Sequence, residues 1–307
     1  MSSAILSPET VNIAHQRFAQ LGLKLVFGKN IAEIDAFGSS SIQSRIEDLH
    51  WAFGNPDIKA ILTVIGGFNS NQLLKYIDWG LIKNNPKIFC GYSDITALNN
   101  ALYTKTGLVN YSGPHYSTFG QKLYFDYTLD YFKKCLFSGD PIDIVPSSAW
   151  SDDAWYIDQE ERTRINNEGW YAINHGEASG TIIGANLVTF KGLQGTEYFP
   201  SLKNSILFIE EDSESEPHHV DRDLQSLLLL PDFKEVKGIV FGRFQKQSKM
   251  TQSILRTIIT DKKELRDIPI IADVDLGHTS PMITFPIGGQ VYLKSSKSEI
   301  KLIITKH

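Results

Sequence analysis

The stretch Lys87-Ile88-Phe89-Cys90-Gly91-Tyr92-Ser93-Asp94-Ile95-Thr96 joins a short apolar run to a sequence typical of a helix. A glycine just before such a junction allows a sharp turn, which lifts the Ser93 side chain off a sheet and exposes its hydroxyl. A serine held in this way is a candidate nucleophile. The alternative is a plain strand end at which Ser93 or Asp94 caps the next helix, and this stretch alone leaves both open.

The same turn directs backbone amides toward one point. The amide of Asp94 falls at a predicted helix N-terminus, where unpaired N–H groups and the helix dipole favour a developing negative charge. A second donor is predicted in Gly66-Gly67, which closes the apolar run 60–65 and precedes a predicted helix. Two glycines let the backbone approach a substrate closely. These two segments therefore predict an oxyanion hole.

Two predicted strands in the second half end in groups that can activate a serine. Glu210 closes the apolar run 205–210, and His278 follows the run 270–274. Strand ends are where α/β folds gather functional side chains. A serine nucleophile needs a base to take its proton, and the base needs a carboxylate to orient it. His278 and Glu210 fit these roles, although each alone is also compatible with a capping histidine or an ordinary acid at a strand end.

The composition narrows the range of functions. The 307 residues suffice for two domains, and the net charge of −5 comes without a basic stripe interleaved with aromatic residues. We therefore expect no nucleic-acid partner. No apolar stretch is long enough to span a bilayer, and the N-terminus lacks the features of a secretion signal, so we expect no membrane association and a cytoplasmic location. Cys90 and Cys135 are too few for a disulfide framework and are expected to pack in the core.

Apolar runs alternate with amphipathic helical patterns, which predicts an α/β protein. We expect a doubly wound parallel-sheet domain with the nucleophile at 1–140, a linker and active-site loop at 141–170, and a strand-rich α/β domain with the acid and histidine at 171–307. The predicted elements of the first domain are helices from Ser7 to Leu21 and at 41–53, 72–77, 95–106 and 127–137, and strands at 24–27, 60–65, before Gly91 and at 108–112. The predicted strands of the second domain are 180–184, 205–210, 238–242, 268–274, 289–294 and 299–305, with two helices between them.

The segment 141–169 differs from its surroundings in composition. It contains the acidic Ser151-Asp152-Asp153, and Trp150, Trp155 and Trp170 lie in or next to it. Tryptophans in a segment of this kind either pack over a ligand or a neighbouring subunit, or anchor the linker on the core.

Several motifs, in order and spread over nearly the whole chain, resemble the LD-carboxypeptidase family of serine peptidases, and within it the microcin C self-immunity branch. The motifs in the first half are Gly66-Gly67-Phe68-Asn69-Ser70-Asn71, Asn85-Pro86-Lys87-Ile88, Gly91-Tyr92-Ser93-Asp94, Thr106-Gly107 and Ser112-Gly113-Pro114. Those in the second half are Gly184-Ala185-Asn186-Leu187, Gly195-Thr196-Glu197-Tyr198, the run from Ile206 to Glu210, and Gly277-His278-Thr279-Ser280-Pro281-Met282.

The resemblance implies a role for each matching position. Ser93 matches the nucleophile, Glu210 the acid of the triad and His278 the general base, while the backbone amides of Gly67 and Asp94 match the oxyanion hole. The resemblance also implies a homodimer, and no metal or cofactor.

Two assignments depend on counting along the chain. Family members usually have one glutamate where this chain has Glu210-Glu211, and counting from Leu207-Phe208-Ile209 selects Glu210. In the immunity branch a loop tryptophan stacks on the nucleotide part of the toxin. Trp155 is the corresponding substrate-binding candidate, shifted by a small insertion.

The chain also departs from the family pattern. The family begins with a strand ahead of the Ser7-Pro8 helix, whereas this chain starts almost at that helix, so we expect the first sheet to lack a strand. Ser280 stands where the immunity branch usually has a second histidine, and Ala185 where a glycine is common. Neither change removes a member of the triad.

These roles together predict acyl transfer from an amide substrate. The resemblance offers two substrates: an amide joining an aspartyl residue to a nucleotide, or the bond to the terminal D-alanine of a murein tetrapeptide. The loop tryptophans favour the first, because a murein peptide presents no π surface. A catalytically inactive binding protein of the same fold is the alternative from another class, and the intact triad argues against it.

Overall fold

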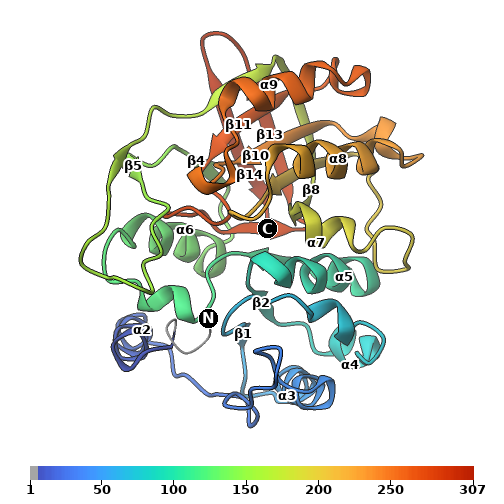
Figure 1. Cartoon of the computed structure of the whole chain (residues 1–307). Helices are drawn as coiled ribbons and strands as arrows, with labels where there is room; N and C mark the ends of the chain where they lie inside the picture. Colours follow the sequence, from blue (N-terminus) through green and yellow to red (C-terminus); the bar gives the residue numbers. More distant parts are fainter. Residues whose placement is uncertain (1–5) are drawn as a thin grey trace.

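The computed structural model describes residues 6–307 and divides the chain between two main sheets (Figure 1). The smaller sheet has the order β1-β2-β3-β12, with β12 antiparallel to β3 and the other neighbours parallel. Its strands are β1 (Ala60–Leu62), β2 (Ile88–Cys90), β3 (Asn110–Ser112) and β12 (Phe285–Ile287). The sheet therefore combines strands from both halves of the chain.

The larger sheet has the order β4-β14-β13-β8-β9-β10-β11-β7. The run from β8 to β11 is parallel, and the other neighbours pair antiparallel. Its strands are β4 (Ile142–Ile144), β7 (Tyr171–Asn174), β8 (Gly176–Asn186), β9 (Ser205–Glu210), β10 (Gly238–Gly242), β11 (Ile270–Val274), β13 (Gln290–Ser295) and β14 (Ile300–Lys306). A separate two-stranded ribbon joins β5 (Ala149–Trp150) to β6 (Ile165–Asn166).

Several of the α-helices begin or end at residues that capping rules favour. Ser7 caps α2, where proline takes the first position, and Gly107 ends α5 in the left-handed region. The α-helices are α2 (Pro8–Gln20), α3 (Ile42–Gly54), α4 (Trp79–Asn84), α5 (Thr96–Thr106), α6 (Asp126–Phe137), α7 (Leu187–Lys191), α8 (Pro217–Leu228) and α9 (Gln252–Thr260). The 3-10 helices are η1 (Ser70–Leu73), η2 (Ser93–Ile95), η3 (Ser117–Gly120), η4 (Phe233–Glu235), η5 (Lys246–Ser248) and η6 (Lys263–Leu265).

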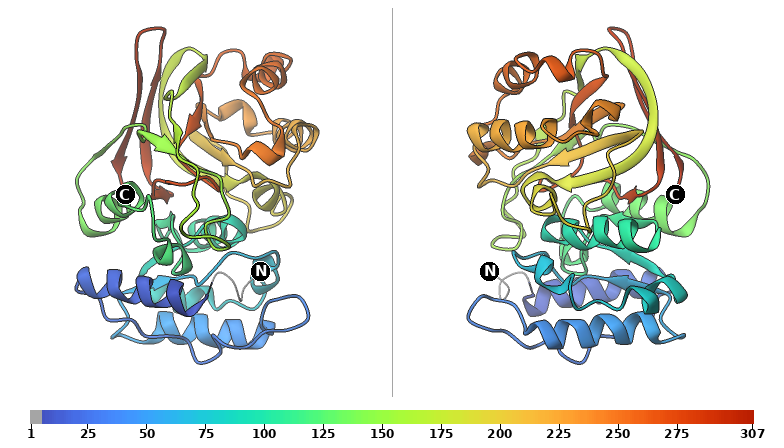
Figure 2. Two further views of the ribbon diagram at one scale, coloured as in Figure 1. Left: turned by 60° about the vertical axis from the view of Figure 1, so that its left-hand side comes forward. Right: turned by 90° about the vertical axis from the view of Figure 1, so that its right-hand side faces the viewer.

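The buried strand β9 shows how the core holds the two parts together. Leu207 and Ile209 pack with α8 and α9 on one face of the larger sheet. Ile206 and Phe208 point to the other face and join a core that includes Phe132 of α6 and residues of β3 and β12. Because both faces are covered, β9 is apolar at successive positions until Glu210. The views in Figure 2 show the resulting stack, with the N-terminal helices at one end and α8 and α9 at the other.

The α/β class and the two-part organisation are as the sequence predicts, with local differences. The predicted strand 24–27 is wrong: these residues form no strand, and Phe27 packs its ring on His15 and Tyr116 instead. The predicted helix 72–77 is reduced to the 3-10 turn η1, and the neighbouring helix α4 was not predicted. The family's strand ahead of α2 would fall outside the described residues.

Two further expectations concern the cysteines and membrane-spanning helices. Cys90 and Cys135 are buried free cysteines, in agreement with a role in packing. Between residues 6 and 307 no helix has the length and apolar composition needed to cross a membrane.

Candidate active site

Ser93 sits in a strained turn between a strand and a helix. β2 ends at Cys90, and η2 begins at Ser93 and continues into α5. Ser93 has a φ of 61°, a conformation that costs a residue with a side chain about 1–2 kcal/mol. Such strain persists where the surrounding structure fixes it, and it is concentrated at functional sites.

The structure brings Ser93, His278 and Glu210 into one hydrogen-bonded chain. Nε2 of His278 lies 3.0 Å from Ser93 Oγ, and its Nδ1 lies 2.7 Å from Glu210 Oε2. Glu210 is the last residue of β9, and His278 lies in the loop that follows β11. The carboxylate is 3% exposed and the imidazole 18% exposed, so the chain of groups is shielded but reachable.

The acid also governs the charge of the histidine. Burial by itself acts to lower the pKa of His278, but the charge and hydrogen bond of Glu210, with smaller contributions from Asp212 and Glu211, raise it above its ordinary value. A histidine with a raised pKa is a stronger proton acceptor, and the carboxylate fixes which nitrogen faces the serine.

Glu211 points away from this chain of groups. Its carboxylate accepts hydrogen bonds from the Val188 amide at 2.7 Å and the Ser215 hydroxyl at 2.8 Å. Burial, followed by the charge of Glu210, raises the pKa of Glu211 to about 7. The geometry therefore associates Glu210, not its neighbour, with His278.

The glycine pair follows β1 and lies against the serine turn. A Cβ on Gly66 would stand 3.0 Å from Ser93 Cβ and 3.2 Å from its Oγ, and one on Gly67 would stand 3.7 Å from the Asp94 carboxylate. Gly67 has a φ of 150°, which side chains rarely adopt. Asp94 is fixed in turn by Ser70, whose amide donates to its carboxylate at 2.8 Å and whose hydroxyl donates to its carbonyl at 2.6 Å.

A second histidine, His115, lies near the site, and the sequence alone assigns it no role. The ring of His115 stacks on Tyr92 at 4.3 Å between centroids, and Tyr92 in turn meets the ring of His278 at 5.4 Å. Nδ1 of His115 lies 2.7 Å from Thr63 Oγ1. Burial, with help from the charge of His278, lowers the pKa of His115 to about 3, so this ring is neutral. Its only signal in the sequence is its place directly after Ser112-Gly113-Pro114.

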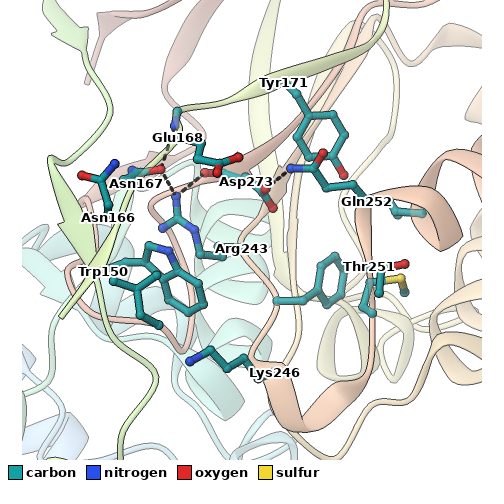
Figure 3. Close-up of a pocket in the computed structure, with 15 residues that line it drawn as sticks. Trp150, Asn166, Asn167, Glu168, Tyr171, Arg243, Lys246, Thr251, Gln252 and Asp273 are labelled. Atoms are coloured by element: carbon teal, nitrogen blue, oxygen red, sulfur yellow. Dashed lines mark hydrogen bonds between the residues drawn. The ribbon is translucent and has the colours of Figure 1, made fainter. Parts of the chain in front are cut away.

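The expected active-site loop forms a strap, defined here as residues 147–167. It contains the β5-β6 ribbon and the loop 151–164 that joins these two strands, here called the excursion. Trp155 lies in the excursion, with its ring against that of Tyr156 at 5.8 Å between centroids. Trp150 instead lines a cavity of about 370 Å³ beside the ends of β10 and β11 (Figure 3).

The structure offers no ready metal site in the region that it describes. Across residues 6–307, no three histidine, cysteine, aspartate or glutamate side chains are grouped so that they could hold a metal ion.

The fold and the arrangement of Ser93, His278 and Glu210 have the geometry of a serine-type hydrolase. The chain matches the LD-carboxypeptidase N-terminal domain over residues 1–113 and the LD-carboxypeptidase C-terminal domain over residues 179–293. It belongs to this family of serine peptidases, as the motifs in its sequence predict.

Named relatives cover nearly the whole chain. The Bacillus subtilis protein YocD, named as a carboxypeptidase, is 53% identical over 100% of this chain and 94% of its own length. The microcin C7 self-immunity protein MccF of Escherichia coli is 34% identical over 92% of this chain and 84% of its own length. A Bacillus subtilis protein named as a murein peptide carboxypeptidase is 29% identical over 94% of this chain and 86% of its own.

Solved structures agree with the fold. An MccF-like protein from Bacillus anthracis has a TM-score of 0.97 and 53% identity, covering 99% of this chain and 93% of that one. MccF in complex with aspartyl sulfamoyl adenosine has a TM-score of 0.86 and 31% identity, covering 97% of this chain and 91% of that one.

Proposed function

We propose that this enzyme hydrolyses the amide-type bond between an acidic aminoacyl group and a nucleoside-bearing leaving group, with Ser93 as nucleophile. The observation that carries the proposal is the chain of hydrogen bonds from Ser93 through His278 to Glu210, at 3.0 and 2.7 Å. Few arrangements other than nucleophilic catalysis require a strained serine, an imidazole and a buried carboxylate in this order.

The steps follow from the positions of these groups. His278 takes the Ser93 proton through Nε2 as Oγ attacks the carbonyl carbon, and Glu210 stabilises the imidazolium that forms. The amides of Gly67 and Asp94 hold the oxyanion, each contributing about 3 kcal/mol to lowering the barrier. His278 then gives its proton to the leaving nitrogen, and water, activated by the same imidazole, releases the acyl group from Ser93.

The choice of substrate rests on the relatives and on the strap. MccF, 34% identical to this chain, is named for immunity to microcin C7, and one MccF structure contains aspartyl sulfamoyl adenosine. The strap of this chain carries Trp150 and Trp155, which offer π surfaces for a nucleobase. We assign Trp155 as the residue that contacts the base.

A second candidate substrate is a murein tetrapeptide, from which the same chemistry would release the terminal D-alanine. It is favoured by the family match to LD-carboxypeptidase domains and by the relative named as a murein peptide carboxypeptidase. The triad geometry serves both substrates, since each presents a carbonyl to a serine.

The test is product analysis by mass spectrometry after incubation of the protein, and of Ser93→Ala, with aspartyl sulfamoyl adenosine and with murein tetrapeptide. We expect the wild-type protein to release aspartate from the first and the variant to release none. Release of D-alanine from the second alone would replace the proposed substrate. Turnover by a folded Ser93→Ala protein, with circular dichroism matching the wild type, would remove the proposed nucleophile.

A further inference from the structure

The strap touches both halves of the molecule. In its excursion, the Gln159 side chain donates to the Gly120 carbonyl at 2.8 Å and accepts from the Lys122 amide at 2.9 Å. Nearer its base, Ser151 exchanges two backbone hydrogen bonds with Ser280, at 2.7 and 2.8 Å. Ser280 lies two residues beyond His278, so the strap runs directly alongside the segment that carries the histidine.

Both ends of the strap are held by one buried ion pair. Arg243 Nη1 lies 2.7 Å from Asp275 Oδ1, with the two side chains 5% and 0% exposed. The Asp275 carboxylate also accepts from Ser147, at 2.9 Å from its amide and 2.7 Å from its hydroxyl. Arg243 Nη2 donates to the Asn167 side chain at 2.9 Å, and Asn167 donates to the Ser147 carbonyl at 2.8 Å. Ser147 and Asn167 are the first and last residues of the strap.

The partners of Arg243 leave its charge well satisfied. Its Nη2 also donates to the Asp273 carbonyl at 3.0 Å, and the guanidinium lies 5.1 Å from the ring centroid of Trp150. Figure 3 shows the guanidinium between Asn167 and Asp273, with Trp150 beside it. A buried ion pair is seldom favourable for stability alone, because desolvation offsets the attraction, whereas its directional bonds fix geometry. This argues for a role in positioning.

The location of the pair connects it to the triad. Arg243 directly follows β10 and Asp275 directly follows β11, while Glu210 ends the adjacent strand β9. His278 is three residues beyond Asp275. The strand ends that place the acid and the histidine therefore also hold the strap.

We propose that Arg243 and Asp275 are positioning residues that lock the base of the strap in register with His278, and so determine how the strap meets the leaving group of the substrate. The effect on the leaving group of the substrate rests on the proposed function. The role of the ion pair in holding the strap does not depend on it.

The test uses Asn167→Ala, which removes the hydrogen bond that Arg243 donates to Asn167, and those that Asn167 donates to Ser147 and Asp275, while leaving the ion pair in place. Asn166→Ala is the matched control, because Asn166 is the adjacent asparagine and is exposed at the end of β6. In Asn167→Ala we expect amide hydrogen exchange in residues 152–165 to accelerate about tenfold. We also expect the KM for aspartyl sulfamoyl adenosine to rise about fivefold, with kcat changed less than about twofold. Labelling of Ser93 by a small fluorophosphonate should keep its wild-type rate.

Asp275→Asn extends the series, because it keeps the side-chain volume but leaves Arg243 without its counter-charge. We expect a larger rise in KM and in strap exchange than for Asn167→Ala. Equal strap exchange and equal KM in Asn167→Ala and Asn166→Ala would overturn the proposal. If the wild-type protein labels with fluorophosphonate but does not cleave the nucleoside substrate, the proposed function fails, and the exchange comparison still decides the role of the ion pair.

Discussion

Gly277 lies directly against the side chain of Glu210. A Cβ on Gly277 would stand 2.7 Å from Glu210 Cβ and 2.9 Å from its Cδ, and Gly277 has a φ of 94°. The histidine-bearing loop can pass beside the acid only because this position has no side chain. The close approach is what allows His278, the next residue, to reach Glu210 at 2.7 Å.

Gly277→Ala should therefore damage the site specifically. The added methyl group must displace the Glu210 carboxylate or the histidine loop, and a shift of about 1 Å in a catalytic group costs roughly 100-fold in rate. We expect kcat/KM for the cleaved substrate to fall by about that factor. Steady-state kinetics measures the loss, and circular dichroism verifies the fold.

Gly195→Ala is the control for backbone strain alone. Gly195 has a φ of 76°, but a Cβ there would meet no atom within 4 Å. It should cost about 1–2 kcal/mol of stability and leave kcat/KM unchanged. Equal loss of activity in the two alanine variants would show that strain, not contact with Glu210, explains the effect at Gly277.

Glu210→Gln should change both the rate and its pH dependence. His278 must be neutral to accept the serine proton, so kcat/KM rises as pH passes through its pKa, which in the wild type lies above the ordinary 6.5. Removing the carboxylate charge lowers that pKa and moves the acid limb to lower pH. It also replaces an acceptor-only carboxylate by an amide that can donate to Nδ1 and so select the wrong tautomer of the ring, which costs about 10⁴-fold in kcat. An acid limb that stays in place would indicate that Glu210 does not control the charge of His278.

The catalytic candidates were predictable because local patterns end at or shortly before them, and because the family motifs select the catalytic interpretation over helix capping or an ordinary acid at a strand end. Glu210 closes a continuous apolar run, and Gly91 precedes Ser93 at a strand-to-helix junction. The hydrogen bonds that hold the ends of the strap were not predictable, since Ser147 and Asp275 are separated by 128 positions and nothing in their local sequence links them. β12 was missed for the same reason: its pairing with β3 is between distant segments and only three residues long.

The wrong prediction of a strand at 24–27 has a related cause. Its apolar residues have the composition of a strand, but a strand also needs a partner to satisfy its backbone hydrogen bonds. Phe27 contributes instead to an aromatic contact with His15 and Tyr116. His115 was overlooked because burial and the neighbouring histidine, which keep it neutral, are properties of the folded state alone.

Glu211→Gln should alter how stability depends on pH. The folded protein holds the Glu211 proton up to about pH 7, whereas the unfolded chain releases it near 4.5. The folded state therefore binds more protons between these values, and this group's contribution to stability falls as pH rises from 4.5 to 7. Gln does not titrate, so the free energy of unfolding of the variant, relative to wild type, should increase by about 2 kcal/mol from pH 5 to pH 8.

Urea unfolding at the two pH values measures this difference. Glu214→Gln, which replaces an exposed acid in the same segment, is the matched control and should show a much smaller change. A stability difference for Glu211→Gln that is constant from pH 5 to pH 8 would contradict the raised pKa.

Ser93→Gly and Ser93→Ala should separate the strain of the turn from the chemistry of the hydroxyl. Both variants lack the nucleophile, so neither should hydrolyse substrate or react with a fluorophosphonate. They differ in the backbone, because alanine at a φ of 61° keeps the steric cost that glycine avoids. We expect Ser93→Gly to be the more stable by about 1 kcal/mol, since part of the relief is offset by the greater freedom of glycine in the unfolded chain. Chemical denaturation of the pair measures the difference. If Ser93→Ala were the more stable, the turn would not store strain, and the exposure of the serine would have to come from Gly91 and Gly66 alone.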